Sequence, residues 1–215
     1  MRLQNKVMEN RILWKALDLM LFHGVKHVTM DDLATQLGIS KKTIYQFYKD
    51  KDTLVKAVVE VALEEHVYKH TKAQNDAENS VHEIFLMLEE MQAMFKSMNP
   101  IAMSELAKYY PEAFVKIDQF KNEFMLSIIK NNLIKGIEQG VYRDNIDIEI
   151  LSKYRLATLF VPFDIHVFPQ NKFDLGNVNF QIIENFIYGV MTLEGIRLME
   201  QYKQEKISKY INKQV

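Results

Sequence analysis

The sequence predicts an all-α fold of about nine helices. Only 7 Gly and 4 Pro occur among its 215 residues, so few positions interrupt long helices. Apolar residues recur mainly at the three- and four-residue spacing of amphipathic helices, and the alternation typical of strands is almost absent. With 48% hydrophobic and 26% charged residues, the chain has the composition of a globular protein that buries a real core.

Capping residues predict where the first helices begin. Thr29 and Asp32 have the spacing of a capping box, in which each side chain bonds the backbone N–H of the other residue. Ser40 is the N-cap candidate for the next helix, and Asp50 or Asp52 for the one after it. The four helices expected in this part of the chain span residues 6–23, 30–37, 41–47 and about 53–72.

The rest of the chain contains fewer but clear helix stops. The polar stretch 71–80 has few apolar residues and is the expected linker. A break is expected at Pro111, because the residue before a proline is disfavoured in helical geometry, and Pro162 should kink the helix that contains it. Asp147 is the N-cap candidate for that helix. The five helices expected here span residues 81–98, about 101–109, 112–138, 148–167 and 178–206.

Composition narrows the function classes. With 0 Cys, the chain has no thiol nucleophile, thiolate metal site or disulfide, and this fits a reducing compartment. No apolar run approaches the roughly 20 residues that span a bilayer, so we expect a soluble, cytoplasmic protein. Residues 1–52 hold nine basic and six acidic residues, a charge of +3, whereas the remainder is −4. A basic N-terminal part on an acidic body permits contact with nucleic acid.

The second and third expected helices form a helix-turn-helix pattern. Two short helices are joined by a turn containing Gly38, and Ala34 is small enough for close helix packing. Ile44 and Tyr48 would face the core, which leaves the polar side chains at the start of the third helix pointing outward. The N-terminal residues of such a helix contact base edges in the major groove. The outward set consists of Lys41, Lys42, Thr43, Tyr45 and Gln46.

These residues carry a resemblance to a known family. The stretches ILWKALDLMLFHG, VTMDDLATQLGISKKTIYQFYKDKDTL and LIKGIEQGVYRD resemble the TetR/AcrR family of bacterial transcriptional regulators. The resemblance implies a three-helix DNA-binding domain at 1–52, and an effector-binding and dimerisation domain at 53–215. By position it also implies that Lys41, Lys42 and Tyr45 face bases. It implies contacts to the DNA backbone from Thr29, Thr43, Gln46 and Lys51, and for Gln46 it leaves open an additional contact to a base. Phe47 departs from the family pattern, in which a polar-capable residue is frequent.

A ligand pocket is expected in the body. Met87, Met91, Met94 and Met98 form one helical stripe, and flexible methionines suit a pocket that adapts to apolar ligands, although ordinary core packing has the same spacing. The resemblance favours a pocket for a small lipophilic effector. Its expected lining residues are Met91, Met94, Phe95, Met103, Tyr110, Phe114, Phe124, Ile128, Tyr154, Phe160 and Phe163. Polar groups that could orient a ligand, each expected instead to be a surface residue or a satisfied partner, are Asn131, Arg155, Asp164 and His166.

Partners follow from the same reasoning. We expect double-stranded operator DNA, a homodimer through helices 147–167 and 178–206, no membrane and no cofactor. Glycine lowers the stability of a helix, and close approach of another helix would explain why Gly189 and Gly195 occur in the helix 178–206. The proposed mechanism is a dimeric repressor on an inverted repeat, released when a ligand moves the helix 52–72.

Two alternatives remain open. A constitutive DNA-binding protein without an effector would have the same N-terminal domain but a fully packed body. A helical metal-binding enzyme would have to use His66 and His70, which lie one helical turn apart. That pair lacks the adjacent glutamate of zinc proteases, so we expect neither a metal nor catalysis.

Overall fold

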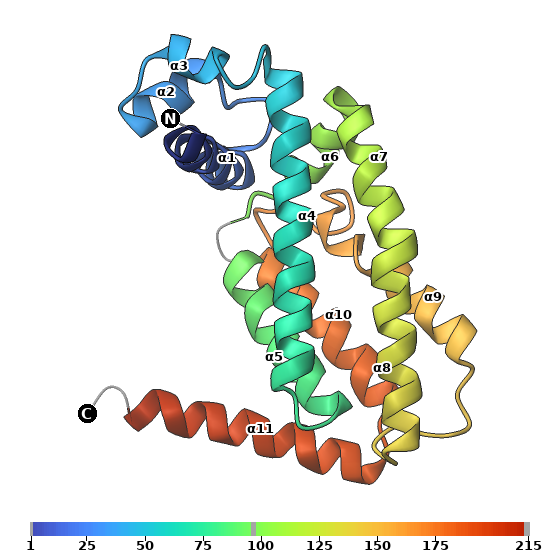
Figure 1. Ribbon diagram of the computed structural model, residues 1–215. Coiled ribbons are helices and arrows are strands. Elements are labelled where there is room, and N and C mark those ends of the chain that lie inside the picture. Colours follow the sequence, from blue (N-terminus) through green and yellow to red (C-terminus); the bar gives the residue numbers. More distant parts are fainter. Residues whose placement is uncertain (1, 96–97, 213–215) are drawn as a thin grey trace.

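The computed structural model describes residues 2–95 and 98–212 and confirms the all-α fold (Figure 1). Over these residues there are eleven α-helical segments, a π-helical turn and a 3-10 turn. The described part contains no strand, and its one isolated β-bridge joins Tyr142 to Met191. None of the described helices is long and apolar enough to cross a membrane.

The N-terminal domain consists of three helices. Helix α1 spans Arg2–His23, α2 spans Met30–Leu37 and α3 spans Lys41–Tyr45. The predicted order is confirmed, although α1 begins four residues before the predicted position 6 and α3 ends two residues before Phe47. Two isoleucines and one leucine at the centre of this unit are 0% exposed, so all three helices contribute to one core: Ile12, Leu33 and Ile44.

Helix α4 (Lys51–Asp76) connects the N-terminal domain to the body (Figure 1). The prediction that residues 71–80 form a linker is wrong in its first part, because α4 continues through Asp76 and only residues 77–79 separate it from α5. His70 and Ala73, in the last two turns, are buried against the body, and this packing supports a helix whose other face is polar. Leu54 and Val55, directly after the predicted boundary at 52/53, belong to a hydrophobic cluster that also contains Ala102 and Leu106 of the body.

Four helical segments complete the first half of the body. These are α5 (Ser80–Phe95), α6 (Ile101–Tyr109), α7 (Pro111–Phe120) and α8 (Leu126–Glu138). A π-helical turn over Lys121–Met125 joins α7 to α8 without a gap. The predicted long helix 112–138 is therefore confirmed as one continuous helix. The last part of the predicted helix 81–98 lies partly outside the described residues, since 96–97 are not described.

The two C-terminal helix predictions need correction. Helix α9 spans Ile148–Thr158 and ends before Pro162, which lies in a separate 3-10 turn over Val161–Phe163. Proline lacks the N–H that would continue the helix, so the expected kink is instead a stop.

The predicted helix 178–206 is two helices, α10 (Leu175–Val190) and α11 (Leu193–Asn212). The chain is extended at Met191, and Thr192 donates its N–H to the carbonyl of Val141 at 3.0 Å. A Cβ at Gly195 would overlap that carbonyl, so this glycine permits close approach of the turn after α8. No atom lies within 4 Å of a Cβ built at Gly189.

Candidate nucleic-acid interface and ligand cavity

The helix-turn-helix is held by local hydrogen bonds. Thr29 caps α2, accepting from the N–H of Asp32 at 3.1 Å, while the Asp32 carboxylate accepts from the N–H of Thr29 at 2.9 Å. The hydroxyl and the backbone N–H of Thr29 both donate to the Asp32 carboxylate, and these two bonds lower the pKa of Asp32. Gly38 has a φ of 66°, a left-handed conformation that glycine adopts without steric cost, and Ser40 caps α3 through the N–H of Thr43 at 3.1 Å. The capping prediction is therefore confirmed in its geometry.

Four of the predicted DNA-contacting side chains form one exposed group on and just after α3. These are Lys41, Lys42, Tyr45 and Gln46. Tyr45 is 44% exposed, so a large part of its side chain is open to solvent. The Lys41 ammonium lies 2.6 Å from the Asp31 carboxylate, and this hydrogen bond raises the pKa of Lys41. The outward group thus combines hydrogen-bond donors with an apolar ring.

The other three predicted contacts are engaged within the chain. The hydroxyl of Thr29 donates to Asp32 at 2.7 Å, and the hydroxyl of Thr43 lies 2.8 Å from that of Ser40. Lys51 is partly buried and donates to the carbonyl of Lys26 at 2.9 Å, and burial lowers its pKa. To bind a DNA phosphate, each of these side chains would have to give up its hydrogen bond within the chain or form a second bond beside it.

Phe47 is a core residue. Its side chain is partly buried and packs against the hydrophobic cluster of the N-terminal domain. This packing explains an aromatic residue at a position where the resemblance favours a polar one.

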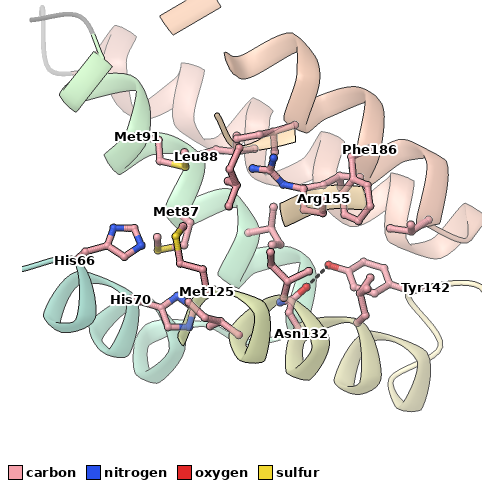
Figure 2. Close-up of a pocket in the computed structure, with 18 residues that line it drawn as sticks. His66, His70, Met87, Leu88, Met91, Met125, Asn132, Tyr142, Arg155 and Phe186 are labelled. Carbon is pink, nitrogen blue, oxygen red and sulfur yellow. Dashed lines mark hydrogen bonds between the residues drawn. The ribbon is translucent and has the colours of Figure 1, made fainter. Parts of the chain in front are cut away.

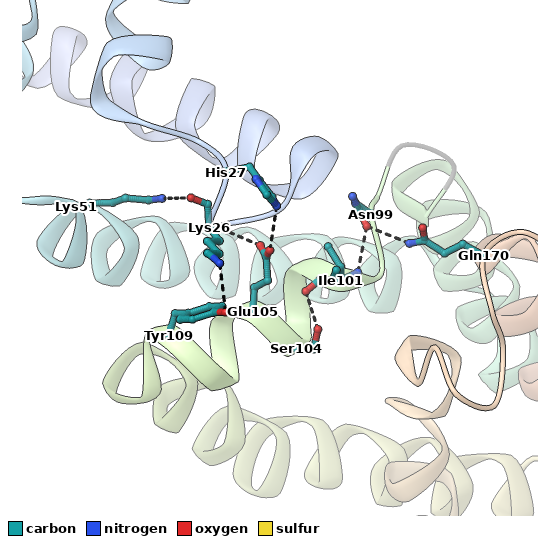
Figure 3. Close-up of polar contacts among 9 residues, drawn as sticks. All are labelled: Lys26, His27, Lys51, Asn99, Ile101, Ser104, Glu105, Tyr109 and Gln170. Carbon is teal, nitrogen blue, oxygen red and sulfur yellow. Dashed lines mark hydrogen bonds and ion pairs between the residues drawn. The ribbon is translucent and has the colours of Figure 1, made fainter.

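Sequence reasoning missed a polar contact between the N-terminal domain and α6, which we call the head–body contact: Lys26, His27, Glu105 and Tyr109 (Figure 3). The Glu105 side chain is buried, accepts the N–H of Lys26 at 2.8 Å and lies 3.6 Å from Nε2 of His27. The Lys26 ammonium lies 3.4 Å from the Tyr109 hydroxyl. The bonded groups are 79 residues apart in the chain, so no local pattern indicates them.

Gly24 makes this contact possible. Its φ of 88° is a conformation that other residues rarely adopt, and a Cβ built there would lie 2.7 Å from the Glu105 carboxylate. Close by, the N–H of Asn99 donates to the carbonyl of Leu21 at 2.7 Å (Figure 3 shows Asn99 beside this contact). The end of α1 is therefore bonded to the segment that leads into α6.

The body contains a partly open cavity of about 100 Å³ (Figure 2). Its wall comes from α4, α5, the π-helical turn, α8, α9 and α10, and most of the lining is apolar. Three methionines contribute to it: Met87, Met91 and Met125. The polar lining residues are His66, His70, Asn132, Tyr142 and Arg155. Sequence reasoning missed most of this wall, because it depends on which helix faces meet.

The polar lining side chains are largely neutral. Burial lowers the pKa of His70 to about 4 and also lowers that of His66. The Tyr142 hydroxyl lies 3.0 Å from Oδ1 of Asn132, as Figure 2 shows, and burial raises the pKa of Tyr142. Nε2 of His70 lies 3.7 Å from the buried carboxyl of Glu83, whose pKa burial raises.

Only some of the predicted ligand-lining residues meet at this cavity. Met91 and Ile128 line it, and the Phe124 ring lies 5.9 Å from His70, behind the wall. Tyr154 is half exposed and lies 6.2 Å from Phe186. Phe95, Met103 and Phe163 pack in a separate small cluster, Tyr110 and Phe114 pack against the core of the N-terminal domain, and Phe160 contacts Phe163. Met94 lies outside the wall on the exposed side of α5.

The histidine pair belongs to the cavity. His66 and His70 face the rings of Phe120 and Phe124 at 5.6 and 5.9 Å. Over residues 2–95 and 98–212, no group of three or more His, Cys, Asp or Glu side chains is placed to hold a metal ion.

Comparison with known proteins agrees with this architecture. Residues 12–58 match the family of bacterial regulatory proteins described as the tetR family. An uncharacterized HTH-type transcriptional regulator, YvaF of Bacillus subtilis (strain 168), is 27% identical over 184 residues, which cover 85% of this chain and 95% of YvaF.

Two solved structures share the fold. A TetR-family transcriptional regulator from Agrobacterium tumefaciens has a TM-score of 0.71 at 13% identity, covering 87% of this chain and 100% of its own. FadR of Bacillus subtilis, solved with stearoyl-CoA, has a TM-score of 0.61 at 16% identity, covering 85% and 99%. The family match over residues 12–58, the HTH-type relative and the shared fold together support a TetR-family regulator.

Proposed function

We propose that the protein is a ligand-responsive repressor that binds an inverted-repeat operator as a homodimer. The observation that carries this proposal is the course of α4. Its first turns, with Leu54 and Val55, pack in the core of the N-terminal domain, whereas His66 and His70 of the same helix line the body cavity. A ligand that moves α4 would therefore move the DNA-binding domain with it.

We assign base contacts to Lys41, Lys42 and Tyr45, with Gln46 at the edge of the same exposed group. Lysine can donate to guanine, glutamine to adenine, and an aromatic ring can contact a thymine methyl group. Thr29, Thr43 and Lys51 are assigned to the DNA backbone, where hydroxyls and ammonium groups position a protein without specifying sequence. The assignment predicts different consequences for the two sets, since loss of a base contact relaxes specificity and loss of a phosphate contact weakens all sequences alike.

The dimer is assigned to the segments 147–167 and 178–206. Large apolar side chains remain exposed on these segments in the single chain, and they are Ile150, Tyr154, Val161, Ile165, Val167 and Leu193. A two-fold dimer would place two recognition helices about 34–36 Å apart, or a multiple, to meet successive major grooves. Sedimentation at micromolar concentration should show a dimer, and a monomer would contradict the assignment.

The effector is assigned to the cavity and is lipophilic, as its mainly apolar wall suggests. FadR of Bacillus subtilis, which shares this fold, was solved in complex with stearoyl-CoA, and this is consistent with a lipophilic effector here. The cavity also favours a ligand-responsive regulator over a constitutive DNA-binding protein, for which a fully packed body is expected. The protein is expected to exist with two different spacings of its paired DNA-binding domains. The ligand changes operator affinity only by binding more tightly to one of these two arrangements than to the other.

Selection of bound DNA from a random pool tests the function directly. We expect a palindromic consensus, and separate selections with Lys42→Ala and Tyr45→Ala should lose enrichment at defined positions of each half-site. A variant outside both the exposed group and the segments assigned to the dimer, Lys172→Ala between the 3-10 turn and α10, is the control and should select the wild-type consensus. No enriched sequence, or a consensus unchanged in both α3 variants, would contradict the proposal.

A further inference from the structure

The cavity wall contains a buried cation, Arg155. It lies on α9 and is only 7% exposed, although arginine is almost never this buried without a paired anion. Figure 2 shows its guanidinium among the lining side chains, together with Leu88 and Phe186. Sequence reasoning treated Arg155 as a surface residue or a satisfied partner, and the structure corrects the first of these.

Arg155 has no acidic partner among the residues that the structure describes. Its side chain makes one hydrogen bond, from Nη1 to the Thr158 hydroxyl at 3.3 Å, and guanidinium has five N–H donors. Burial lowers its pKa to about 10, which still leaves it protonated at neutral pH. A buried, charged group with most of its donors unused indicates a missing anion.

The remaining wall supplies no second charge. The two lining histidines are neutral because burial lowers their pKa values, and the other polar lining groups are the amide of Asn132 and the hydroxyl of Tyr142. Those two groups lie 3.0 Å apart and bond each other. The cavity therefore offers one positive charge in an apolar chamber.

We propose that the effector is an apolar monocarboxylate whose carboxylate binds Arg155 and whose hydrocarbon part fills the methionine-lined cavity. This inference rests on the proposed ligand-responsive function. The planar guanidinium fork matches a carboxylate with two parallel hydrogen bonds. The long, flexible side chains of Met87, Met91 and Met125 can move to admit chains of different length.

The charge balance separates this ligand from an acyl-CoA. A free carboxylate carries one negative charge, which Arg155 alone neutralises, whereas the phosphates of coenzyme A carry several. Burying unpaired charge is costly, so phosphates could bind only outside this chamber. Neutral alcohols of the same length would leave Arg155 without an anion.

Calorimetric titration of the full-length protein tests the proposal with butanoate, hexanoate and octanoate, and with octan-1-ol and octanoyl-CoA for comparison. We expect one octanoate per chain, bound at least about tenfold more tightly than octan-1-ol. Arg155→Met should weaken octanoate binding by about 30-fold or more while leaving octan-1-ol binding unchanged or tighter. Lys172→Met removes an exposed charge outside the cavity wall and outside the segments assigned to the dimer, and it should leave octanoate binding unchanged.

Several results would overturn the carboxylate assignment. These are octan-1-ol binding as tightly as octanoate, octanoate binding unchanged in Arg155→Met, binding of octanoyl-CoA alone, and no binding of any probe. The wild-type comparison of acid with alcohol needs no variant, so the test holds even if Arg155→Met folds poorly. Operator selection does not involve this cavity, and a palindromic consensus with negative titrations would reject the ligand class while the DNA-binding function stands.

Discussion

Replacing Glu105 by alanine should loosen the attachment of the DNA-binding domain to the body. The buried carboxylate accepts the Lys26 N–H at 2.8 Å and lies 3.6 Å from His27. A hydrogen bond to a charged group contributes about 1.5–3 kcal/mol, and alanine would also leave the Lys26 N–H without its partner. We therefore expect Glu105→Ala to lower the free energy of unfolding by about 2–3 kcal/mol. Glu105→Gln keeps an acceptor oxygen and should lose less.

Urea unfolding followed by circular dichroism measures this change, with Glu112→Ala as the matched control. Glu112 lies on the neighbouring helix α7, is exposed and pairs with Lys56, so its loss should change stability by less than about 1 kcal/mol. If Glu105→Ala is as stable as the Glu112→Ala control, the buried contact does not hold the two parts together. The reasoning about the head–body contact would then be refuted.

Three further predictions concern the body. Arg155→Met should raise the free energy of unfolding of the ligand-free protein by about 1–4 kcal/mol, because it removes a buried charge without an anion; a lower midpoint in urea would contradict this. Burial lowers the pKa of His70 to about 4 in the folded protein, so its imidazole is neutral there at neutral pH. As the pH falls below about 6.5, the imidazole is protonated in the unfolded chain but not yet in the folded one. The free energy of unfolding should therefore fall by up to about 3 kcal/mol between pH 6.5 and 4. Glu83, with its raised pKa, opposes part of this loss, so the measurement compares wild type with His70→Gln, which should show a shallower decline; equal slopes would reject the assignment. Gly136→Ala would place a methyl group against the Tyr142 ring and should cost about 1–3 kcal/mol in thermal or urea unfolding, whereas an unchanged midpoint would mean that the ring moves freely.

Local chemistry accounts for the parts of the fold that could be predicted. Thr29 with Asp32, Ser40 and Gly38 define the helix-turn-helix through bonds between residues three or four positions apart, and each appears in the sequence as a recognisable pair or a single glycine. Pro111 likewise begins α7 at the position that its missing N–H favours.

Long-range contacts account for what could not be predicted. The helix ending at Val190 is stopped without a nearby proline, because Thr192 bonds the carbonyl of Val141 from another part of the chain. Arg155 has no sequence signal of burial, since its position in the wall depends on how α9 packs against its neighbours. Among the predicted ligand-lining residues, Met91 and Ile128 line the cavity because their helices turn those faces inward.

The salt dependence of operator binding tests the central claim, that the exposed group on α3 binds DNA, most directly. The logarithm of the affinity for the selected operator should fall linearly with the logarithm of salt concentration, because basic side chains release counterions from phosphates. In the double variant Lys42→Ala/Tyr45→Ala, which removes two base contacts, we expect weaker binding to the selected operator by about 2–4 kcal/mol with the dimer intact. In Lys51→Ala, which removes a phosphate contact, we expect a salt slope reduced by about 1. Affinity and slope equal to those of the wild type would contradict the claim.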